Sequence, residues 1–275
     1  MRSALFLIPL ALSSAACSDL AEDAVAPAGM MNAAEQPPVP PAPPTAPAEA
    51  GEEFTDNAEQ GEAKREFAYS WPAAVVAEPA LVQRLEAERD EQLAQQKAEW
   101  AEALTDSPEG CIACINRGFE KEWKVVADLP RYLSLSADLY VYSGGAHGNY
   151  GRTSLVWDRE TGTAVEGVDL FRSPVALETA LGARLCDALD HQRAERRGAP
   201  VERTGEWSAD CPGIDEATVF VGSSNGETFD RIGIYFGPYV AGSYAEGPYE
   251  LDFPATASVL DAVKPEYAKA FTLGR

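Results

Sequence analysis

Residues 132 to 142 alternate apolar and polar side chains without a break, and this pattern constrains the fold more than any other in the chain. One side of the alternation carries Leu133, Leu135, Ala137, Leu139 and Val141. The other side carries Tyr132, Ser134, Ser136, Asp138, Tyr140 and Tyr142. Successive side chains of a strand point to opposite faces of its sheet, so this segment is predicted to be a strand with one apolar face.

Further strands are predicted on both sides of this segment, several of them linked by hairpins. They lie at residues 67–71, 119–126, 150–157, 163–165, 218–221, 230–236 and 249–253. Residues 158–162, with the sequence Asp-Arg-Glu-Thr-Gly, have the composition of a hairpin turn.

Two main helices are predicted. Glu78-Pro79 opens the first, which continues to about residue 105, because proline is tolerated in the first turn. Ser173-Pro174 caps the second, which ends in the charged run 193–197 before Gly198. Its leucines recur every fourth residue, at Leu177, Leu181, Leu185 and Leu189. A short helix is expected at 259–263. Strands and helices do not alternate strictly, so the expected fold class is α+β, with largely antiparallel sheets packed with two main helices.

Residues 1–17 have the pattern of an export signal. A positive residue, Arg2, precedes an apolar run at 4–12 that is too short to span a bilayer as a mature helix. The run ends in Ser14-Ala15-Ala16-Cys17, and small residues directly before a cysteine resemble a bacterial lipobox. We therefore expect Cys17 to be lipidated and to become the mature N-terminus, with simple secretion as the alternative.

Residues 18–64 are rich in Pro, Ala and Glu. Residues 18–63 contain ten acidic residues and no Lys or Arg, and residues 37–44 are almost all proline. Such a segment favours extended polyproline II and has too little apolar surface to fold. It is predicted to be a disordered tether that holds a folded part, starting near residue 65, away from a membrane.

The chain is strongly acidic. Its formal net charge is -22, and the residues outside 18–63 still contain 34 acidic against 22 basic residues. Nucleic-acid binding needs clustered Lys and Arg, so we expect no nucleic-acid partner. A cationic partner would instead be attracted to this surface.

Four cysteines remain besides Cys17. An even number in an exported protein suggests two disulfides, and three pairings are possible. We favour Cys111–Cys114 and Cys186–Cys211. The spacing of Cys111 and Cys114 also suits a redox pair or half of a zinc site, which stay as alternatives.

The segment Ser143-Gly-Gly-Ala-His-Gly-Asn-Tyr-Gly151 joins two predicted strands and is the first candidate site. Adjacent glycines indicate an unusual backbone path, because Gly adopts positive φ without steric cost. We predict a binding surface at Gly144, Gly145, His147, Asn149 and Tyr150.

His147 has two further possible roles. It could act as a general base, with Ser143 and Asp138 near in sequence, but no nucleophile elbow motif is present. A zinc role would need more ligands at recognisable spacing, so we expect neither a metal nor a cofactor. The other histidine, His191, is expected to be a solvated residue near a helix end.

Aromatic residues gather in the C-terminal part of the sequence. Tyrosine and tryptophan combine a stacking face with a polar tip, which suits glycans and protein partners. We assign Tyr235, Tyr239 and Tyr244 to the binding surface. Packing of these residues in the core, together with Tyr249, Phe236 and Trp157, is the alternative.

Several of these segments resemble known families. The segment 143–150, Trp157-Asp158 with Thr161-Gly162, and Gly167-Val-Asp-Leu-Phe171 resemble the start of domain-of-unknown-function family 3298. The segments 234–239 and 244–248, with Leu251-Asp-Phe-Pro254, resemble the second signature of that family. Residues 65–142 resemble the smaller family 4163 that usually precedes it. The resemblance divides the folded part into 65–142 and 143–275.

The resemblance implies an extracytoplasmic α+β domain. Such domains are found in lipoproteins, in the outer portion of a lysozyme-sensing anti-sigma factor and ahead of some polysaccharide deacetylase domains. The chain departs from the family pattern at Gly148, where proline is commoner, and at residues 240–243. We expect no deacetylase domain after Arg275 and no transmembrane or sigma-binding segment before the folded part, so neither activity is expected to carry over.

These observations lead to one functional expectation and one alternative. We expect a cell-envelope lipoprotein, anchored by lipid at the periplasmic face of a bacterial membrane, the outer membrane by preference. It would be a non-enzymatic binding module for an envelope glycan, such as a peptidoglycan fragment, or for a cationic protein such as lysozyme. The alternative is an envelope hydrolase that acts on peptidoglycan or an ester, with His147 as general base.

The lipobox makes a direct prediction. Cells supplied with a fatty-acid analogue should label the wild-type protein, because the Cys17 thiol is the acceptor, and should not label Cys17→Ala. The measurement is in-gel detection of the analogue. Equal labelling of the two proteins would contradict lipidation at Cys17.

Overall fold

The structure is a computed structural model that describes residues 51–205 and 208–275. The expected signal segment, Cys17 and residues 18–50 of the expected tether lie outside the described residues. Within the described part, no helix is both long enough and apolar enough to cross a bilayer.

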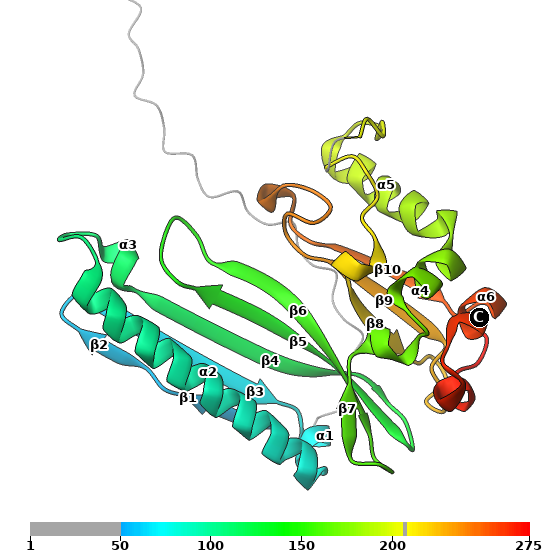
Figure 1. Ribbon diagram of the computed structural model, residues 1–275, viewed down its shortest axis with the longest axis horizontal. Coiled ribbons are helices and arrows are strands. Elements are labelled where there is room, and N and C mark those ends of the chain that lie inside the picture. Colours follow the sequence, from blue (N-terminus) through cyan, green and yellow to red (C-terminus); the bar gives the residue numbers. More distant parts are fainter. Residues whose placement is uncertain (1–50, 206–207) are drawn as a thin grey trace, which may run out of the picture. The chain divides into compact units, whose positions relative to one another are not determined.

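The larger sheet has seven strands (Figure 1). They are β1 (Glu52–Thr55), β2 (Ala58–Gln60), β3 (Ala63–Trp71), β4 (Arg117–Asp128), β5 (Tyr132–Tyr142), β6 (Asn149–Asp158) and β7 (Thr163–Val165). Their order is β1-β3-β4-β5-β6-β7, with β2 also paired to β3. The alternating segment 132–142 forms β5 at its predicted bounds and pairs with both neighbours in antiparallel register.

The smaller sheet has three antiparallel strands in the order β10-β9-β8. They are β8 (Thr218–Gly222), β9 (Arg231–Phe236) and β10 (Tyr249–Pro254). The helices are α1 (Ala73–Val76), α2 (Pro79–Asp106), α3 (Ile112–Ile115), α4 (Pro174–Leu181), α5 (Ala183–Arg197) and α6 (Ala257–Ala262). The expected α+β class with mostly antiparallel sheets is confirmed.

One pair of strands departs from the antiparallel pattern. β3 and β4 are parallel, with Phe67 opposite Phe119. Parallel neighbours need a crossover, and the long helix α2 lies in that connection. Helix α2 begins at Pro79 as predicted and runs along the larger sheet (Figure 1). Its buried residues Leu81 and Leu85 belong to the same core as side chains of that sheet.

The larger sheet carries a separate core on each face. Towards α2, the apolar side chains of β5 and β6 form one core, and Leu133, Leu135 and Leu155 are at most 5% exposed. On the opposite face, Tyr132 and Val156 belong to a second core, which includes the smaller sheet. β8 lies against β4, β5 and β6 there.

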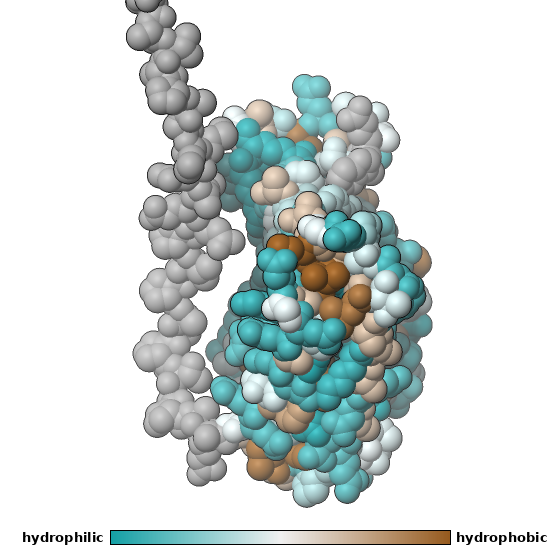
Figure 2. All heavy atoms as spheres, turned by 90° about the vertical axis from the view of Figure 1, so that its left-hand side faces the viewer, coloured by the Kyte–Doolittle hydropathy of each residue, from teal (hydrophilic) through white to brown (hydrophobic). Residues whose placement is uncertain are grey.

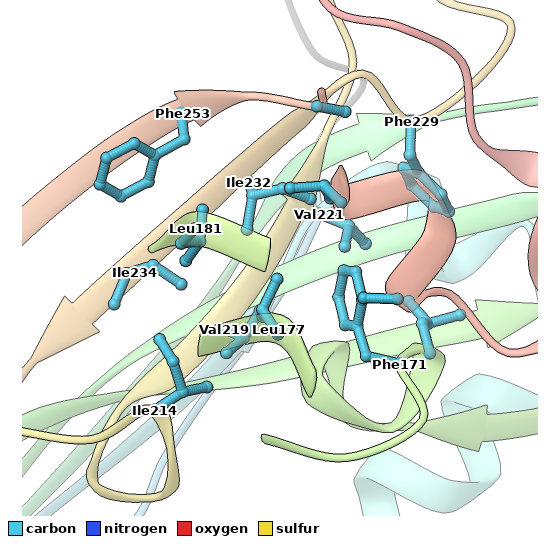
Figure 3. Packing of buried hydrophobic residues seen from close by; sticks show 14 of the residues in the cluster. Phe171, Leu177, Leu181, Ile214, Val219, Val221, Phe229, Ile232, Ile234 and Phe253 are labelled. Carbon is cyan, nitrogen blue, oxygen red and sulfur yellow. The ribbon is translucent and has the colours of Figure 1, made fainter. Parts of the chain in front are cut away.

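The second core is filled from α4, α5 and α6. Figure 3 shows Leu177 and Leu181 of α4 among side chains from β8 and β9, with Phe171 and Phe229 alongside. The four predicted leucines of the second helix, Leu177, Leu181, Leu185 and Leu189, are all buried. Ser173 caps α4 as expected, and its side chain accepts a hydrogen bond from the backbone N–H of Ala176 at 3.1 Å.

The single helix expected at this place is two helices. Gly182, with φ +58° and ψ -143°, separates α4 from α5. The leucines on both sides of Gly182 are buried, because residues four positions apart lie on the same face of a helix. The four-residue spacing of the leucines therefore did not reveal that one helix ends and another begins at Gly182.

The ordered chain begins earlier than residue 65. β1 and β2 both pair with β3, although the sequence of 52–62 is acidic. Two polar contacts hold this edge: the buried Arg65 forms an ion pair with Asp56, and Asn57 accepts a hydrogen bond from the N–H of Phe67 at 3.0 Å. The expected disordered tether therefore does not include residues 52–60, because these long-range contacts are invisible in local composition.

The two expected disulfides are confirmed. Cys111–Cys114 has a Cα–Cα distance of 5.3 Å and links the N-cap of the short helix α3 to a residue within that helix. Cys186–Cys211 has a Cα–Cα distance of 5.5 Å and ties α5 to the segment that follows it.

The expected division at residue 142 falls in the turn between β5 and β6. These strands pair along ten positions, from Tyr132 opposite Asp158 to Val141 opposite Asn149. Residues on both sides of position 142 therefore contribute strands to one sheet and side chains to the same two cores.

The second core gives a stability prediction. Leu181→Ala should lower the free energy of unfolding by about 2–5 kcal/mol, because it leaves a cavity where a side chain is 1% exposed. The matched control is Val175→Ala on the same helix, since Val175 is 68% exposed and its loss should cost about 0.5 kcal/mol or less. Denaturant unfolding of both variants is the measurement. Equal destabilisation would refute this assignment of the core face.

Candidate functional site

The β5–β6 loop follows the path that its glycines predicted. Gly144 and Gly145 have φ values of +105° and +98°, a region that other residues rarely adopt. A Cβ atom on Gly144 would lie 3.2 Å from the carbonyl oxygen of Ala113 in α3. Gly144 therefore lies against the disulfide-bonded turn, and the two glycines shape the site rather than line its aromatic part.

His147 lies on the ring of Tyr244, which comes from the β9–β10 loop. Their ring centroids are 4.0 Å apart, with 26° between the planes. Tyr150 meets Tyr244 edge to face at 5.5 Å, and Tyr239 lies 5.6 Å from it on a tilted plane. We call these four residues the aromatic ledge: His147, Tyr150, Tyr239 and Tyr244. It joins residues almost a hundred positions apart in the sequence.

Gly148 is the point where the two loops meet. Its carbonyl oxygen accepts a hydrogen bond from the Tyr244 hydroxyl at 2.8 Å and a second from Nδ1 of His147 at 2.9 Å. A carbonyl oxygen only accepts, so the His147 proton sits on Nδ1. A Cβ atom on Gly148 would overlap the ring of Tyr140. The close approach explains why glycine stands here in place of proline.

The β9–β10 loop is held by a charged network on its inner side. Glu246 accepts hydrogen bonds from the Tyr249 hydroxyl at 2.6 Å and from Arg197 at 2.9 Å. Arg196 donates to the carbonyl oxygens of Glu246 and Pro248, both at 2.7 Å. Burial alone would raise the pKa of the Glu246 carboxyl, but the hydrogen bonds from Tyr249 and Arg197 hold it below its usual range.

Arg193 of α5 is the largest fully buried side chain of the described residues. Its guanidinium donates to the carbonyl oxygens of Ala241, Ala209 and Asp210 at 2.6–3.0 Å. It thereby fixes both the loop that carries Tyr239 and the segment tied down by Cys186–Cys211. A buried charge is tolerated only when it is paired in this way.

A cavity of about 350 Å³ adjoins the ledge, with Tyr150 belonging to both. It lies between β4, β5 and β6 of the larger sheet and β9 and β10 of the smaller one. We call it the acidic groove, and its charged and aromatic walls are Glu120, Glu122, Asp138, Tyr140, Tyr150, Arg152, Tyr235 and Glu250.

Arg152 spans the floor of the acidic groove. Its guanidinium donates to Asp138 at 2.6 Å and to Glu250 at 2.8 Å, so it links the two sheets. It also lies 5.8 Å from the ring centroid of Tyr235. Burial raises the pKa of the Tyr235 hydroxyl to about 12. Partial burial alone would raise the pKa of Asp138, but hydrogen bonds from Lys124 and Arg152 lower it.

The structure divides the residues that the sequence had grouped. His147, Tyr150, Tyr239 and Tyr244 come together in the ledge, and Asn149 is exposed at the start of β6. Tyr235 is 4% exposed and belongs to the groove wall. Tyr249 and Phe236 are buried in the second core, and Trp157 is buried in the core under α2.

Sequence analysis missed the acidic groove. The alternation of β5 had placed Asp138 and Tyr140 on its polar face, and Tyr150 and Arg152 alternate in the same way on β6. That signal was sufficient to predict a polar sheet face. The partner Glu250 lies almost a hundred residues further on, so no local pattern could have brought it to Arg152.

The surroundings of His147 do not form a catalytic set. The hydrogen bond of its ring goes to a carbonyl oxygen, and Asp138 pairs with Lys124 and Arg152 instead. In residues 51–205 and 208–275, no group of three or more His, Cys, Asp or Glu side chains is placed to hold a metal ion. His191 is exposed, 3.8 Å from Glu195.

Hydrophobic surface is scarce around this end of the molecule. Figure 2 shows the side that carries α3 in Figure 1, and it is mostly hydrophilic, with a hydrophobic patch near the middle and a smaller one near the lower end of the view. Ile112 of α3 is 43% exposed. This side therefore offers a ligand mainly polar surface.

Comparison with known proteins gives limited similarity. Residues 58–150 match the family described as "Deacetylase PdaC", a stretch that runs from β2 to the start of β6. No curated protein matches the chain.

Two solved structures described as DUF3298 family members are similar to this chain. The one from Bacteroides fragilis is 18% identical with a TM-score of 0.47 and covers 80% of this chain and 95% of its own. The one from Pseudomonas aeruginosa is 19% identical with a TM-score of 0.46 and covers 84% and 99%. Solved structures named for family 3298 are thus among the proteins similar to this chain. The assignment of residues 65–142 to a 4163-type family stays a prediction.

The network around Glu246 predicts a pH-dependent stability. Its folded-state pKa lies below the unfolded value of about 4.3, so its contribution is present above that pH and is lost as the pH falls through the folded pKa. Glu246→Gln should lower the unfolding free energy by about 1–3 kcal/mol at neutral pH, and the difference should shrink in acid. Glu91→Gln, exposed on α2, is the control for denaturant unfolding across pH. A difference that does not vary with pH would contradict a role for the charge.

Proposed function

We propose that this protein is a non-enzymatic binding module of the bacterial cell envelope and that its aromatic ledge binds a glycan. The observation that carries the proposal is the stack of His147 on Tyr244 with the exposed Tyr239 beside it. Flat rings with polar tips suit sugar rings, because one face is apolar and the edges donate and accept hydrogen bonds.

The backbone of the ledge supports this proposal. Tyr239 has φ +69°, the one non-glycine residue with positive φ among the described residues, and its side chain is 53% exposed. A tyrosine in this conformation is uncommon and costs free energy, which the surrounding contacts have to offset. The loop that carries it is fixed by Arg193 and Arg196. The ring is therefore preorganised in an exposed position, which lowers the entropic cost of binding.

The proposed envelope location rests on the sequence. A lipobox at Cys17 and two disulfides are typical of an exported, anchored protein. We place the domain at the periplasmic face of a membrane, with peptidoglycan fragments as the first candidate glycan. A cationic protein such as lysozyme is the second candidate, favoured by the excess of 34 acidic over 22 basic residues outside 18–63.

The matching family is described as a deacetylase, and hydrolysis is the enzymatic alternative for this chain. A hydrolase would need a nucleophile or activated water beside its base. The hydrogen bond of His147 to the Gly148 carbonyl and its stack on Tyr244 favour a binding role instead.

Titration with soluble peptidoglycan fragments tests this function. Tyr239→Ala should weaken binding about three- to tenfold, because an exposed stacking face is lost. Val175→Ala, at a similarly exposed apolar residue on α4, should bind as the wild type does. Calorimetry gives the affinities.

Two outcomes would overturn non-enzymatic glycan binding at the ledge. One is the absence of fragment binding together with tight, salt-sensitive binding of lysozyme, since exposed charges are screened over about 8–10 Å at physiological ionic strength. The other is cleavage of the fragments that His147→Ala abolishes.

A further inference from the structure

The acidic groove has a strong bias of charge. Four carboxylates line it, and Arg152 is the one guanidinium among its lining residues. Lys124 also pairs with two of these carboxylates, Glu122 and Asp138, at 2.8 Å each. Four negative charges therefore stand against two positive charges. The lowered pKa of Asp138 keeps the carboxylate ionised in mild acid as well as at neutral pH.

The groove also has aromatic walls. Tyr140 is 41% exposed and stands on the β5 side, while Tyr150 and Tyr235 contribute from β6 and β9. Ammonium groups are attracted to the faces of aromatic rings and donate hydrogen bonds to carboxylates. Carboxylates next to tyrosine rings in a concave site thus suit a primary amine. An anionic group would instead meet an excess of negative charge.

The groove extends beyond the space for a single sugar ring. A second cavity of about 200 Å³ shares Tyr235 and Glu250 with it and continues along Phe220, Arg231 and Asp252. At the other end, Tyr150 connects the groove to the aromatic ledge. Ledge, groove and second cavity are thus neighbours that share lining residues, which fits a chain of several linked units better than a compact small molecule.

We propose that the acidic groove selects glycan chains that carry free amino groups, such as β-1,4-linked glucosamine units, over their N-acetylated counterparts. The inference rests on the proposed glycan binding at the ledge and names the chemistry of the ligand. Aromatic faces of the ledge hold the sugar rings. The ammonium groups are attracted by the excess of negative charge in the groove and pair first with Glu120, which takes part in none of the ion pairs of the described residues. Acetylation removes both the charge and the hydrogen-bond donors that the carboxylates use.

The test compares two hexasaccharides of equal length, one of glucosamine and one of N-acetylglucosamine. Titrations are carried out in mildly acidic buffer, where the amines are protonated. We expect the wild-type protein to bind the amine form at least about fivefold more tightly, with a preference that falls as salt is added. The protein used is the whole chain apart from the expected signal segment, residues 1–17.

Variants separate the groove from the ledge. Glu120→Gln together with Glu122→Gln should reduce binding of the amine hexasaccharide about fivefold, as expected for partly exposed charge pairs, and leave the acetylated form unchanged. Tyr239→Ala should weaken both. Glu91→Gln, exposed on α2, is the charge control. Circular dichroism verifies that each variant is folded.

The outcomes distinguish the preference for free amino groups from the glycan-binding function itself. Equal binding of both hexasaccharides refutes the amine preference and leaves the glycan-binding function standing. Binding of neither one, together with none to peptidoglycan fragments, refutes both. A third outcome is that oligolysine of the same charge binds as tightly as the amine hexasaccharide and that Tyr239→Ala does not weaken this binding. The groove would then respond to charge alone, which also refutes the inference.

Discussion

The alternating side chains of β5 and β6 contribute to two cores, one on each face of the larger sheet, and the rest of the structure depends on this constraint. Their residues facing α2 are apolar along most of the length, with Leu135 and Leu155 buried. On the opposite face, only the end near Tyr132 and Val156 is covered by the smaller sheet. The other end of that face stays open and carries Asp138 and other polar residues. A two-residue period thus produces a core at one end and a groove at the other.

Helix α5 links the stability of the second core to the geometry of the site. Its buried stripe consists of Leu185, Leu189 and Arg193, so the arginine continues the core-facing side and holds the neighbouring loop, while Arg196 in the last turn holds the β9–β10 loop. Desolvating Arg193 would be costly without partners, and its partners are the Asp190 carboxylate at 3.3 Å and backbone carbonyls of two separate segments. The disulfide at Cys186 fixes one of these segments to the same helix. Tyr239 and Tyr244 therefore owe their positions to contacts made well below the surface.

Local signals predicted much of the fold because each feature was encoded within a few residues. The alternation of β5, the Ser173 cap and the positive φ at Gly144 are of this kind. Features that depend on distant partners were missed: the parallel β3–β4 pair, the ordered segment 52–60 and the link from Arg152 to Glu250. The tyrosines show the same limit within the site, since sequence proximity could not tell the exposed Tyr239 from the buried Tyr249.

Gly148 explains how ledge and groove can act as one site. Its carbonyl oxygen is the acceptor for Tyr244 and His147 of the ledge, and its Cα atom lies against Tyr140 of the groove. Any larger residue would displace Tyr140 or shift the carbonyl oxygen away from Tyr244. The rings of His147, Tyr244 and Tyr140 therefore all contact one backbone position. Because glycine has no side chain, the two loops and Tyr140 can approach each other here, and this close approach places the ledge beside the groove.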